Sequence, residues 1–281
     1  MTTDFIHGRP MKQIVLFSLP IMLSSLLQYT YNMVDNIIVG RYVSTNALAA
    51  VGSSGSPIYL LIGFSQGLAV GAGVVVSQYL GAGDHKETRE AVHTALAIAV
   101  VMGLLLTVGG VACGRALLVA MNTPAEVLAD AVTYIRIYFG GVLFSVVYNM
   151  TAGILNAAGN SRRSLVYLAW ASVTNIVLDY LFIAVFRWGI GGAAVATGLG
   201  YSITAIVGLL VFSNRNSLLH FVRPVCRPQT LGRAVTNGCS EMATALVNGI
   251  ITLMFNWTML KYVGEDGVAA ITIISYVLAF A

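Results

Sequence analysis

Charged residues are scarce in this chain. They make up 9% of the 281 residues, whereas 57% are apolar, and the mean hydropathy is +0.82. Soluble domains carry about 25% charged residues, so the composition excludes a water-soluble globule, a disordered tail and a nucleic-acid-binding domain. The net charge of +4 does not indicate a nucleic-acid partner, because Lys and Arg spread over short loops are what membrane topology requires. We expect an all-α polytopic membrane protein.

Groups that carry chemistry or bind metals are equally few. The three cysteines lie far apart and form no CxxC pair, so neither a metal site nor a disulfide framework is indicated. The four histidines are not spaced as a metal cluster, and no phosphate-binding GxxxxGK[ST] loop occurs. We therefore expect no catalytic residues, no enzyme activity and no cofactor, and an ion gradient as the energy source.

Long apolar segments predict the membrane spans. Taking about 20 residues per crossing, they lie near residues 13–37, 54–80, 90–113, 127–154, 163–185, 190–212, 234–260 and 267 onwards. A cytoplasmic N-terminus, which has no cleavage site after it, leaves most Lys and Arg on the cytoplasmic side, as the positive-inside rule requires. We expect a multi-pass protein of the cytoplasmic (inner) membrane, surrounded by lipid. The last span is too short to cross, so we expect the chain to stop inside a helix.

Part of the sequence is repeated. Residues 41–51 resemble residues 261–271, and both segments leave one long helix and enter the next. The offset of 220 residues covers six predicted spans, which predicts a parallel repeat. We expect a first six-helix lobe at 1–212, a cytoplasmic linker at 213–233 and the truncated start of a second lobe at 234–281. About eight transmembrane helices would then be present, and about twelve are expected in the complete protein.

Three acidic residues fall well within the predicted spans: Asp35, Asp179 and Glu241. A carboxylate at membrane depth costs several kcal/mol unless it is neutralised or solvated, so a functional role is expected. Asn175 lies one turn before Asp179, where its amide can hydrogen-bond the acid or share a cation with it. We predict that Asp35, Asp179, Asn175 and Glu241 respond to the coupling ion, H⁺ or Na⁺. A Na⁺ ion would be held by Asp35, Asp179 and Asn175.

Further polar side chains follow the acids on the same and neighbouring helices. Lipid does not tolerate such stripes, so we expect them to line an aqueous cavity for substrate. The residues predicted on this basis are Gln28, Tyr31, Asn32, Tyr138, Asn149 and Asn248. The alternative is that these groups only hold the helices together, as polar side chains do in many bundles.

Glycines recur at four-residue spacing in the second span, at Gly63, Gly67 and Gly71. Such spacing lets another helix approach closely, and a packing role is favoured over a flexible hinge. Pro20 removes one backbone hydrogen bond from the first span and predicts a kink or bend there.

Four segments resemble the multidrug and toxic compound extrusion (MATE) family of transporters. They are Val34-Asp-Asn-Ile-Ile-Val-Gly-Arg41 with Ala47-Leu-Ala-Ala-Val-Gly52, Gly81-Ala-Gly-Asp84, Gly153-Ile-Leu-Asn-Ala-Ala-Gly-Asn160, and Asn175-Ile-Val-Leu-Asp179 with Gly191-Gly-Ala-Ala-Val-Ala-Thr197. The resemblance covers almost the whole first lobe. It implies two lobes that open alternately inward and outward and exchange cationic or amphipathic drugs for H⁺ or Na⁺.

The resemblance also implies which residues respond to the cation. Asp35 and Asp179, with Asn149, Asn175 and Thr197 nearby, would form the site of the first lobe. Glu241 matches an acid that some branches carry early in the seventh helix, whereas other branches lack it, so the coupling ion stays open. The family's seventh helix usually opens with a proline-containing stretch, which is absent from residues 237–241 here.

The sequence therefore predicts a monomeric secondary active antiporter for drugs or other xenobiotics. A lipid-linked or metabolite flippase of related architecture is the alternative, and for it we would expect a strongly cationic central cavity. A structural or receptor protein, in which the polar stripes only pack, is a further alternative. An intramembrane enzyme would need a paired nucleophile and base, which the sequence lacks.

Overall fold

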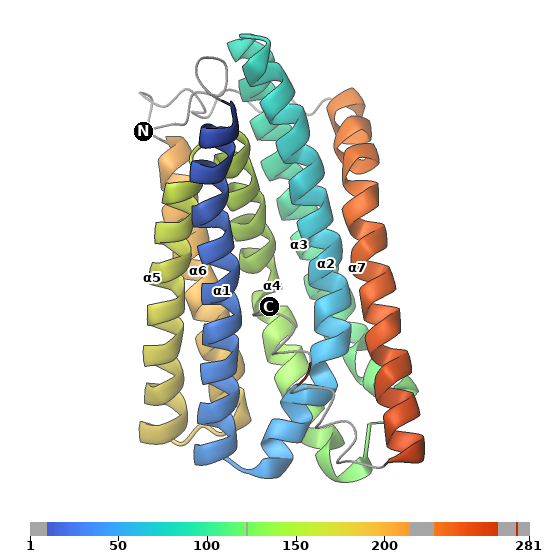
Figure 1. The fold of residues 1–281 in the computed structure, drawn as a ribbon. Helices are drawn as coiled ribbons and strands as arrows, with labels where there is room; N and C mark the ends of the chain where they lie inside the picture. Colours follow the sequence, from blue (N-terminus) through green and yellow to red (C-terminus); the bar gives the residue numbers. More distant parts are fainter. Residues whose placement is uncertain (1–9, 122, 214–227, 264–273, 275–281) are drawn as a thin grey trace.

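The computed structural model describes residues 10–121, 123–213, 228–263 and 274. These residues form seven long helices and no strand (Figure 1). The helices are α1 (Pro10–Tyr42), α2 (Thr45–Gly81), α3 (His85–Ala120), α4 (Ala125–Ala157), α5 (Ser161–Asp179), α6 (Ile190–Ser213) and α7 (Pro228–Tyr262). A short π-helical segment, η1 (Tyr180–Val185), continues α5. Seven spans are long and apolar enough to cross a membrane, α5 and η1 forming one of them.

The all-α membrane fold is thus confirmed, and the helices extend beyond the predicted apolar segments. α1 and α7 each begin at a proline, which the first turn of a helix tolerates because its N–H groups have no partner there. The last six residues of the predicted linker, 228–233, therefore belong to α7. α1 also continues as one helix through Pro20. The predicted eighth span lies outside the described residues, and the division into two lobes stays a prediction.

Tight turns join the helices at the glycine-containing motifs. Gly83 adopts a positive φ of 74°, and Asp84 caps α3 by accepting a hydrogen bond from the Glu87 amide at 3.0 Å. Ser44 caps α2 in the same way, with the Ala47 amide as donor. Side-chain oxygens thus satisfy amide groups that the first turn of a helix leaves without partners.

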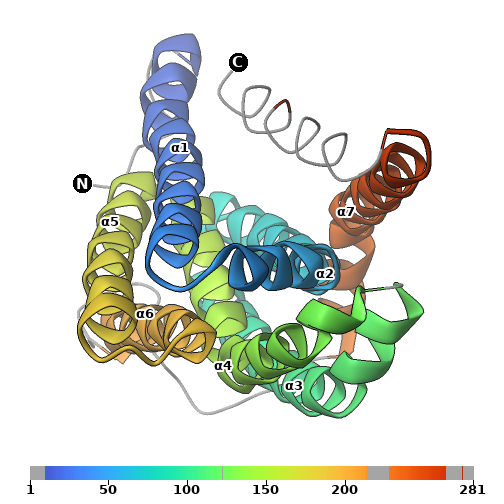
Figure 2. The same ribbon diagram turned by 90° about the horizontal axis from the view of Figure 1, so that it is seen from below.

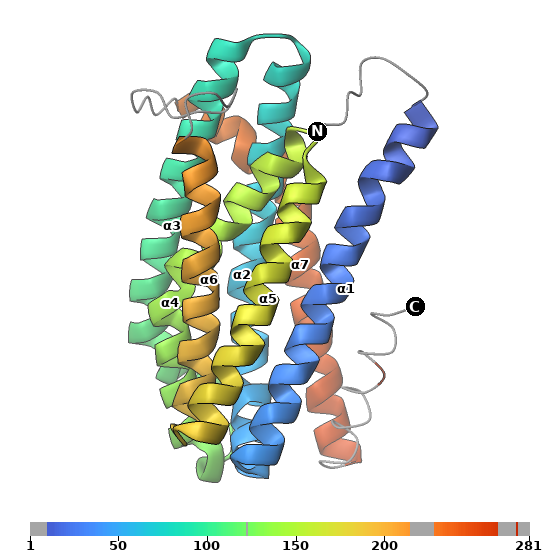
Figure 3. The same cartoon turned by 90° about the vertical axis from the view of Figure 1, so that its left-hand side faces the viewer.

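The helices pack in an order that follows the sequence only in part. α2 packs along α3, α4 and α7, and α4 lies between α2, α3 and α6. α5 packs on α6 and α1, while α1 contacts α2 and α6 only lightly. Figure 2 shows α2 and α4 in the middle, with α1 and α5 on one side and α7 on the other. In Figure 3, α1 is inclined against α5, so α1 is the helix least enclosed by its neighbours.

The glycine row of α2 forms the contact with α7. A Cβ atom on Gly63 would lie 2.5 Å from Cβ of Ala245, and one on Gly67 would lie 2.6 Å from Cγ of Met242. A Cβ atom on Gly71 would overlap the backbone of Ala234. The two backbones are therefore in direct contact along three turns, and the predicted packing role of this row is confirmed.

This contact predicts the effect of adding one methyl group to α2. Gly67→Ala would push Cβ against both the side chain and the backbone nitrogen of Met242, so we expect it to lower the free energy of unfolding by about 1–3 kcal/mol. Gly55→Ala is the matched control, because a Cβ atom there meets nothing within 4 Å. Alanine is the better helix former, so the control should be neutral or slightly stabilising. Thermal unfolding in detergent measures both, and equal midpoints would contradict the close α2–α7 contact.

Candidate functional site

Two carboxylates from different helices lie in one buried region. Asp35 comes from α1 and is 9% exposed, and Asp179 is the last residue of α5 and fully buried. The two side chains are close enough to interact electrostatically. The structure therefore brings together two acids that are 144 positions apart in the sequence.

Neither carboxylate has a compensating positive charge among the residues that the structure describes. Oδ1 of Asp35 and both carboxylate oxygens of Asp179 are buried without a hydrogen-bond partner. Within the described part of the chain, no ion pair reaches either group. A buried charge without a partner is costly, so each group must be protonated, hydrated or neutralised by a bound cation.

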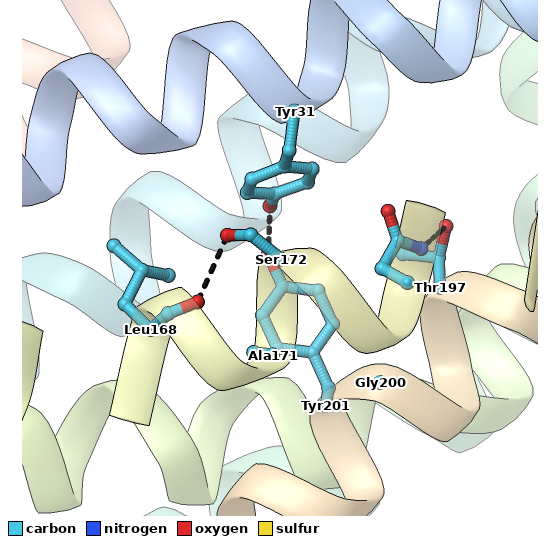
Figure 4. Close-up of a pocket in the computed structure, with 8 residues that line it drawn as sticks. Tyr31, Leu168, Ala171, Ser172, Thr197, Gly200 and Tyr201 are labelled. Carbon is cyan, nitrogen blue, oxygen red and sulfur yellow. Dashed lines mark hydrogen bonds between the residues drawn. The ribbon is translucent and has the colours of Figure 1, made fainter. Parts of the chain in front are cut away.

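An amide and a hydroxyl extend this polar region toward α6. The Asn175 amide nitrogen donates to Oγ1 of Thr197 at 3.5 Å (Figure 4). Thr197 in turn donates to the Ala193 carbonyl at 3.0 Å. This arrangement leaves Oδ1 of Asn175 buried and without a partner. Oxygen atoms of Asp35, Asp179 and Asn175 are thus available in the same helical bundle, and oxygen donors of this kind are those that hard cations prefer.

A cluster of tyrosines lies beside the acids. Tyr31 of α1, Tyr134, Tyr138 and Tyr148 of α4, and Tyr201 of α6 contribute to it. The hydroxyl groups of Tyr31 and Tyr201 are 2.7 Å apart and share a hydrogen bond. Tyr134 interacts electrostatically with both Asp35 and Asp179. Tyr148 and Tyr201 were not among the predicted site residues, although Tyr201 lies one helical turn after Thr197 and could have been found from that spacing.

A small cavity opens within this region. It has room for about one water molecule and is lined by Tyr31, Leu168, Ala171, Ser172, Asn175, Thr197, Gly200 and Tyr201 (Figure 4). Three of these, Tyr31, Asn175 and Thr197, are predicted site residues. A second, shallower depression, with no room for a buried water molecule, includes Tyr138 in its lining.

Other predicted site residues lie elsewhere. Gln28 is half-buried and reaches the Tyr201 hydroxyl, and Asn149 is half-buried on α4 without lining either cavity. Asn32 is exposed, because it lies 100° around α1 from Tyr31. Glu241 and Asn248 are exposed on α7, a helix that packs on α2 and α3. The structure therefore does not bring the α7 stripe together with Asp35 and Asp179.

Metal-binding side chains form no obvious cluster. Among the residues that the structure describes, no group of three or more His, Cys, Asp or Glu could hold a metal ion. A Na⁺ site would instead need the amide oxygen of Asn175 in addition to the two carboxylates, which is the ligand set that the sequence predicts.

Comparisons with known proteins agree with this architecture. The chain is 34% identical to the probable multidrug resistance protein YpnP of Bacillus subtilis over 206 residues, which is 73% of this chain and 46% of YpnP. It is 27% identical to the probable multidrug resistance protein YoeA of the same organism, over 94% of this chain and 59% of YoeA. The fold matches a MOP superfamily transporter from Pyrococcus furiosus with a TM-score of 0.90 and 26% identity, covering 99% of this chain and 62% of that one.

A membrane-spanning helical bundle with buried, uncompensated acids is the architecture of an integral membrane transporter. The MatE family model matches residues 20–181, more than half of the chain. The chain belongs to the MatE family, whose members are transporters. It spans only about half to three fifths of the length of the curated relatives named above.

The missing counter-charge predicts that the acids reduce stability. Asp179→Asn keeps the shape of the side chain but cannot ionise, so folding no longer has to protonate, hydrate or pair a buried carboxylate. We therefore expect the free energy of unfolding to rise by about 1–3 kcal/mol in neutral buffer. Asp84→Asn is the control, since Asp84 is an exposed helix cap and Asn caps equally well. Thermal unfolding in detergent is the measurement. A lower midpoint for Asp179→Asn than for the control would mean that the carboxylate is compensated after all.

Proposed function

We propose that this chain forms the first lobe of a secondary active antiporter. The antiporter exports cationic or amphipathic small molecules, including drugs, and takes up H⁺ or Na⁺ in exchange by alternating access. The observation that carries the proposal is the pair of buried carboxylates, Asp35 and Asp179, which lack any counter-charge among the described residues. Such a pair favours the binding of positive charge.

The two carboxylates can couple the movement of the ion to that of a cationic substrate, because both cations compete for the same negative charge. A proton or Na⁺ that neutralises Asp35 and Asp179 removes the attraction for a cationic substrate, and a bound cationic substrate opposes uptake of the ion. Binding of each cation then weakens binding of the other by the same factor, as thermodynamic linkage requires. Asn175 supports this role, because its free amide oxygen can complete the coordination of Na⁺ next to Asp179.

The positions of the two acids also suggest how ion binding changes the lobe. Asp35 lies on α1 and Asp179 on α5, and two like charges on adjacent helices repel each other. Neutralisation removes this repulsion and lets α1 settle against α5. Because α1 contacts α2 and α6 only lightly, it is the helix with the least packing to lose when it moves.

The cargo is proposed from two lines of support. YpnP and YoeA are described as probable multidrug resistance proteins. The P. furiosus structure is described as one whose reversed pocket polarity suggests a different function. The charge of the pocket is therefore the property that distinguishes cargo classes among such transporters. Here two buried acids lie near the pocket and tyrosines line it, which favours a cationic cargo. No resident cofactor is needed, since the coupling ion is itself a substrate.

The orientation and assembly belong to the same proposal. The N-terminus would lie in the cytoplasm, the lobe would lie in the cell membrane in contact with lipid, and the protein would act as a monomer. The linker between the lobes would then be cytoplasmic, so both lobes would share one orientation as parallel repeats do.

Dye efflux from vesicles tests the proposal. The chain and the longer reading frame that the sequence repeat predicts would be compared, with Na⁺ and pH gradients imposed separately. We expect efflux of a cationic dye under at least one gradient, and a fall of about 100-fold for Asp35→Asn and Asp179→Asn, because neither variant can exchange charge. Asp130→Asn, an exchange of the same kind near the start of α4, should keep the wild-type rate.

The same assay separates the alternatives. A lipid-linked or metabolite flippase would move no cationic dye under either gradient, even with the protein verified in the membrane. A structural or receptor protein would move none, and its folding and behaviour would be unchanged by the two substitutions. Efflux that persists in both Asp variants would contradict the assignment of the ion site.

A further inference from the structure

The connection between η1 and α6 carries an arginine in a backbone conformation that suits glycine. Arg187 has a φ of 57°, and in the described part of the chain it is the one non-glycine residue with a positive φ. A Cβ atom disfavours this left-handed conformation, so helix ends that need it usually carry glycine. Gly189 does so two residues later, with a φ of 61°. An arginine kept at such a position indicates a role for its side chain.

The packing of η1 on α6 fixes the backbone around Arg187. The Trp188 amide donates to the Phe182 carbonyl at 2.9 Å, and the rings of the same two residues stack with their centroids 4.8 Å apart. A Cβ atom added to Gly192 of α6 would lie 3.2 Å from Cβ of Phe182 and 3.3 Å from Cβ of Trp188. α6 therefore packs directly on this stack, and the surrounding contacts impose the conformation of Arg187.

Arg187 lies at a membrane interface. Residues 186–189 are all that separates the span formed by α5 and η1 from the span formed by α6. Phe186 and Trp188, on either side of Arg187, are 51% and 56% exposed. Exposed aromatic rings at the ends of membrane spans lie at the level of the lipid headgroups. The guanidinium group is thus carried at the depth of the lipid phosphates.

The guanidinium group of Arg187 has no acidic partner in the described part of the chain. The side chain is exposed, and no carboxylate there forms an ion pair with it. The sequence contains no Asp or Glu between Asp179, which is fully buried, and Glu241. A cation that is held in place without an internal counter-charge is suited to an anion from outside the protein.

The adjacent turn repeats this combination of residues. Arg41 and Tyr42 end α1, and the Tyr42 ring meets the Tyr180 ring edge-on with the centroids 5.9 Å apart. Arg41 and both tyrosines are exposed, and no acid occurs between Asp35 and Asp84. α7 packs on α2 and α3, and Figure 2 shows it on the other side of the bundle from α1 and α5. α7 therefore does not cover these two turns.

We propose that Arg187 binds the phosphate group of an anionic phospholipid in the leaflet at this end of the bundle. Its planar guanidinium group can donate two parallel hydrogen bonds to phosphate oxygens, while Phe186 and Trp188 contact the start of the acyl chains. Arg41 adds positive potential in the same leaflet, which favours an anionic headgroup over a zwitterionic one. This assignment does not depend on the cargo or the direction of transport.

Lipid titration of the full chain in detergent tests the assignment. Phosphatidylglycerol and phosphatidylcholine with the same acyl chains are added, and their apparent dissociation constants are obtained from the rise in the thermal unfolding midpoint. We expect phosphatidylglycerol to bind at least about fivefold more tightly, and Arg187→Gly to remove most of this preference. Glycine suits the left-handed backbone, so the midpoint without lipid should be equal or higher and a folding defect would not explain the loss. Equal binding of both lipids to the wild type would overturn the proposal.

Two further arms identify the source of the effect. Arg187→Gln is compared with Arg115→Gln, which removes an exposed arginine near the end of α3, and only the former should lower the preference for phosphatidylglycerol. An equal loss in both variants would mean that general surface charge attracts the lipid, and it would overturn the assignment to Arg187. Inorganic phosphate at millimolar concentration should not displace phosphatidylglycerol. Displacement would indicate a site for soluble anions and would overturn the assignment to lipid.

Tryptophan quenching locates the bound lipid. The chain has three tryptophans, so Trp170→Phe with Trp257→Phe leaves Trp188 as the sole reporter, and Trp188→Phe with Trp257→Phe leaves Trp170. Trp170 is exposed in the middle of α5 and is the control for general lipid contact. We expect brominated phosphatidylglycerol to quench Trp188 more strongly than brominated phosphatidylcholine does, and both lipids to quench Trp170 equally. Equal quenching of Trp188 by the two lipids would overturn the proposal.

Discussion

Helices in a lipid bilayer gain little by burying apolar side chains, because the lipid is as apolar as the protein. The helical bundle therefore depends on close contact between helix backbones. Gly63, Gly67 and Gly71 provide it on α2, where their missing side chains admit α7 to van der Waals distance. Gly141 and Gly198 do the same between α4 and α6, beside the cavities. At the site, Gly200 of α6 approaches α5, where an added Cβ atom would lie 3.4 Å from Cβ of Asn175, so glycine also helps to set the spacing of these two helices.

The acids are placed where this scaffold is least tightly packed. α1 carries Asp35 and is attached mainly to α5, and its Tyr31 shares a side-chain hydrogen bond with Tyr201 of α6. Asp179 lies on the partner helix, at its very end. The densely packed helices α2, α3 and α4 thus hold a fixed framework, and the electrostatic interaction lies at its edge, between helices that can respond to a change in charge.

Most of the fold and part of the site could be predicted from the sequence. Seven spans follow from apolar length, and Asp35, Asp179 and Asn175 stand out because polar groups are so rare at membrane depth. Helical spacing predicts which residues share a face, but it does not say which helix that face meets. For this reason the sequence pattern of Glu241 does not show that α7 packs on α2 and α3, apart from Asp35 and Asp179.

Aromatic residues were harder to predict for a related reason. Tyr201 lies in an apolar segment, where an uncharged tyrosine does not stand out in the sequence. Its place in the site follows from its hydrogen bond to Tyr31, which is 170 positions away. The pocket lined by Tyr31 and Tyr201 depends on the way α1, α5 and α6 cross, which the sequence pattern of any single helix cannot report.

The π-helical segment η1 follows directly on Asp179, and it changes what α5 can do. Hydrogen bonds in η1 span one residue more than in an α-helix, as between the Phe186 amide and the Leu181 carbonyl. The π-helical turn therefore acts like one inserted residue: it rotates the side chains that follow by about 100° around the helix axis. The face that carries Asp179 therefore does not continue into η1, where Phe182 instead stacks on Trp188. The same chain segment thus places a carboxylate in the interior and, a few residues later, an aromatic stack at the end of the bundle. The carboxylate and the aromatic rings do not need the same face of the helix.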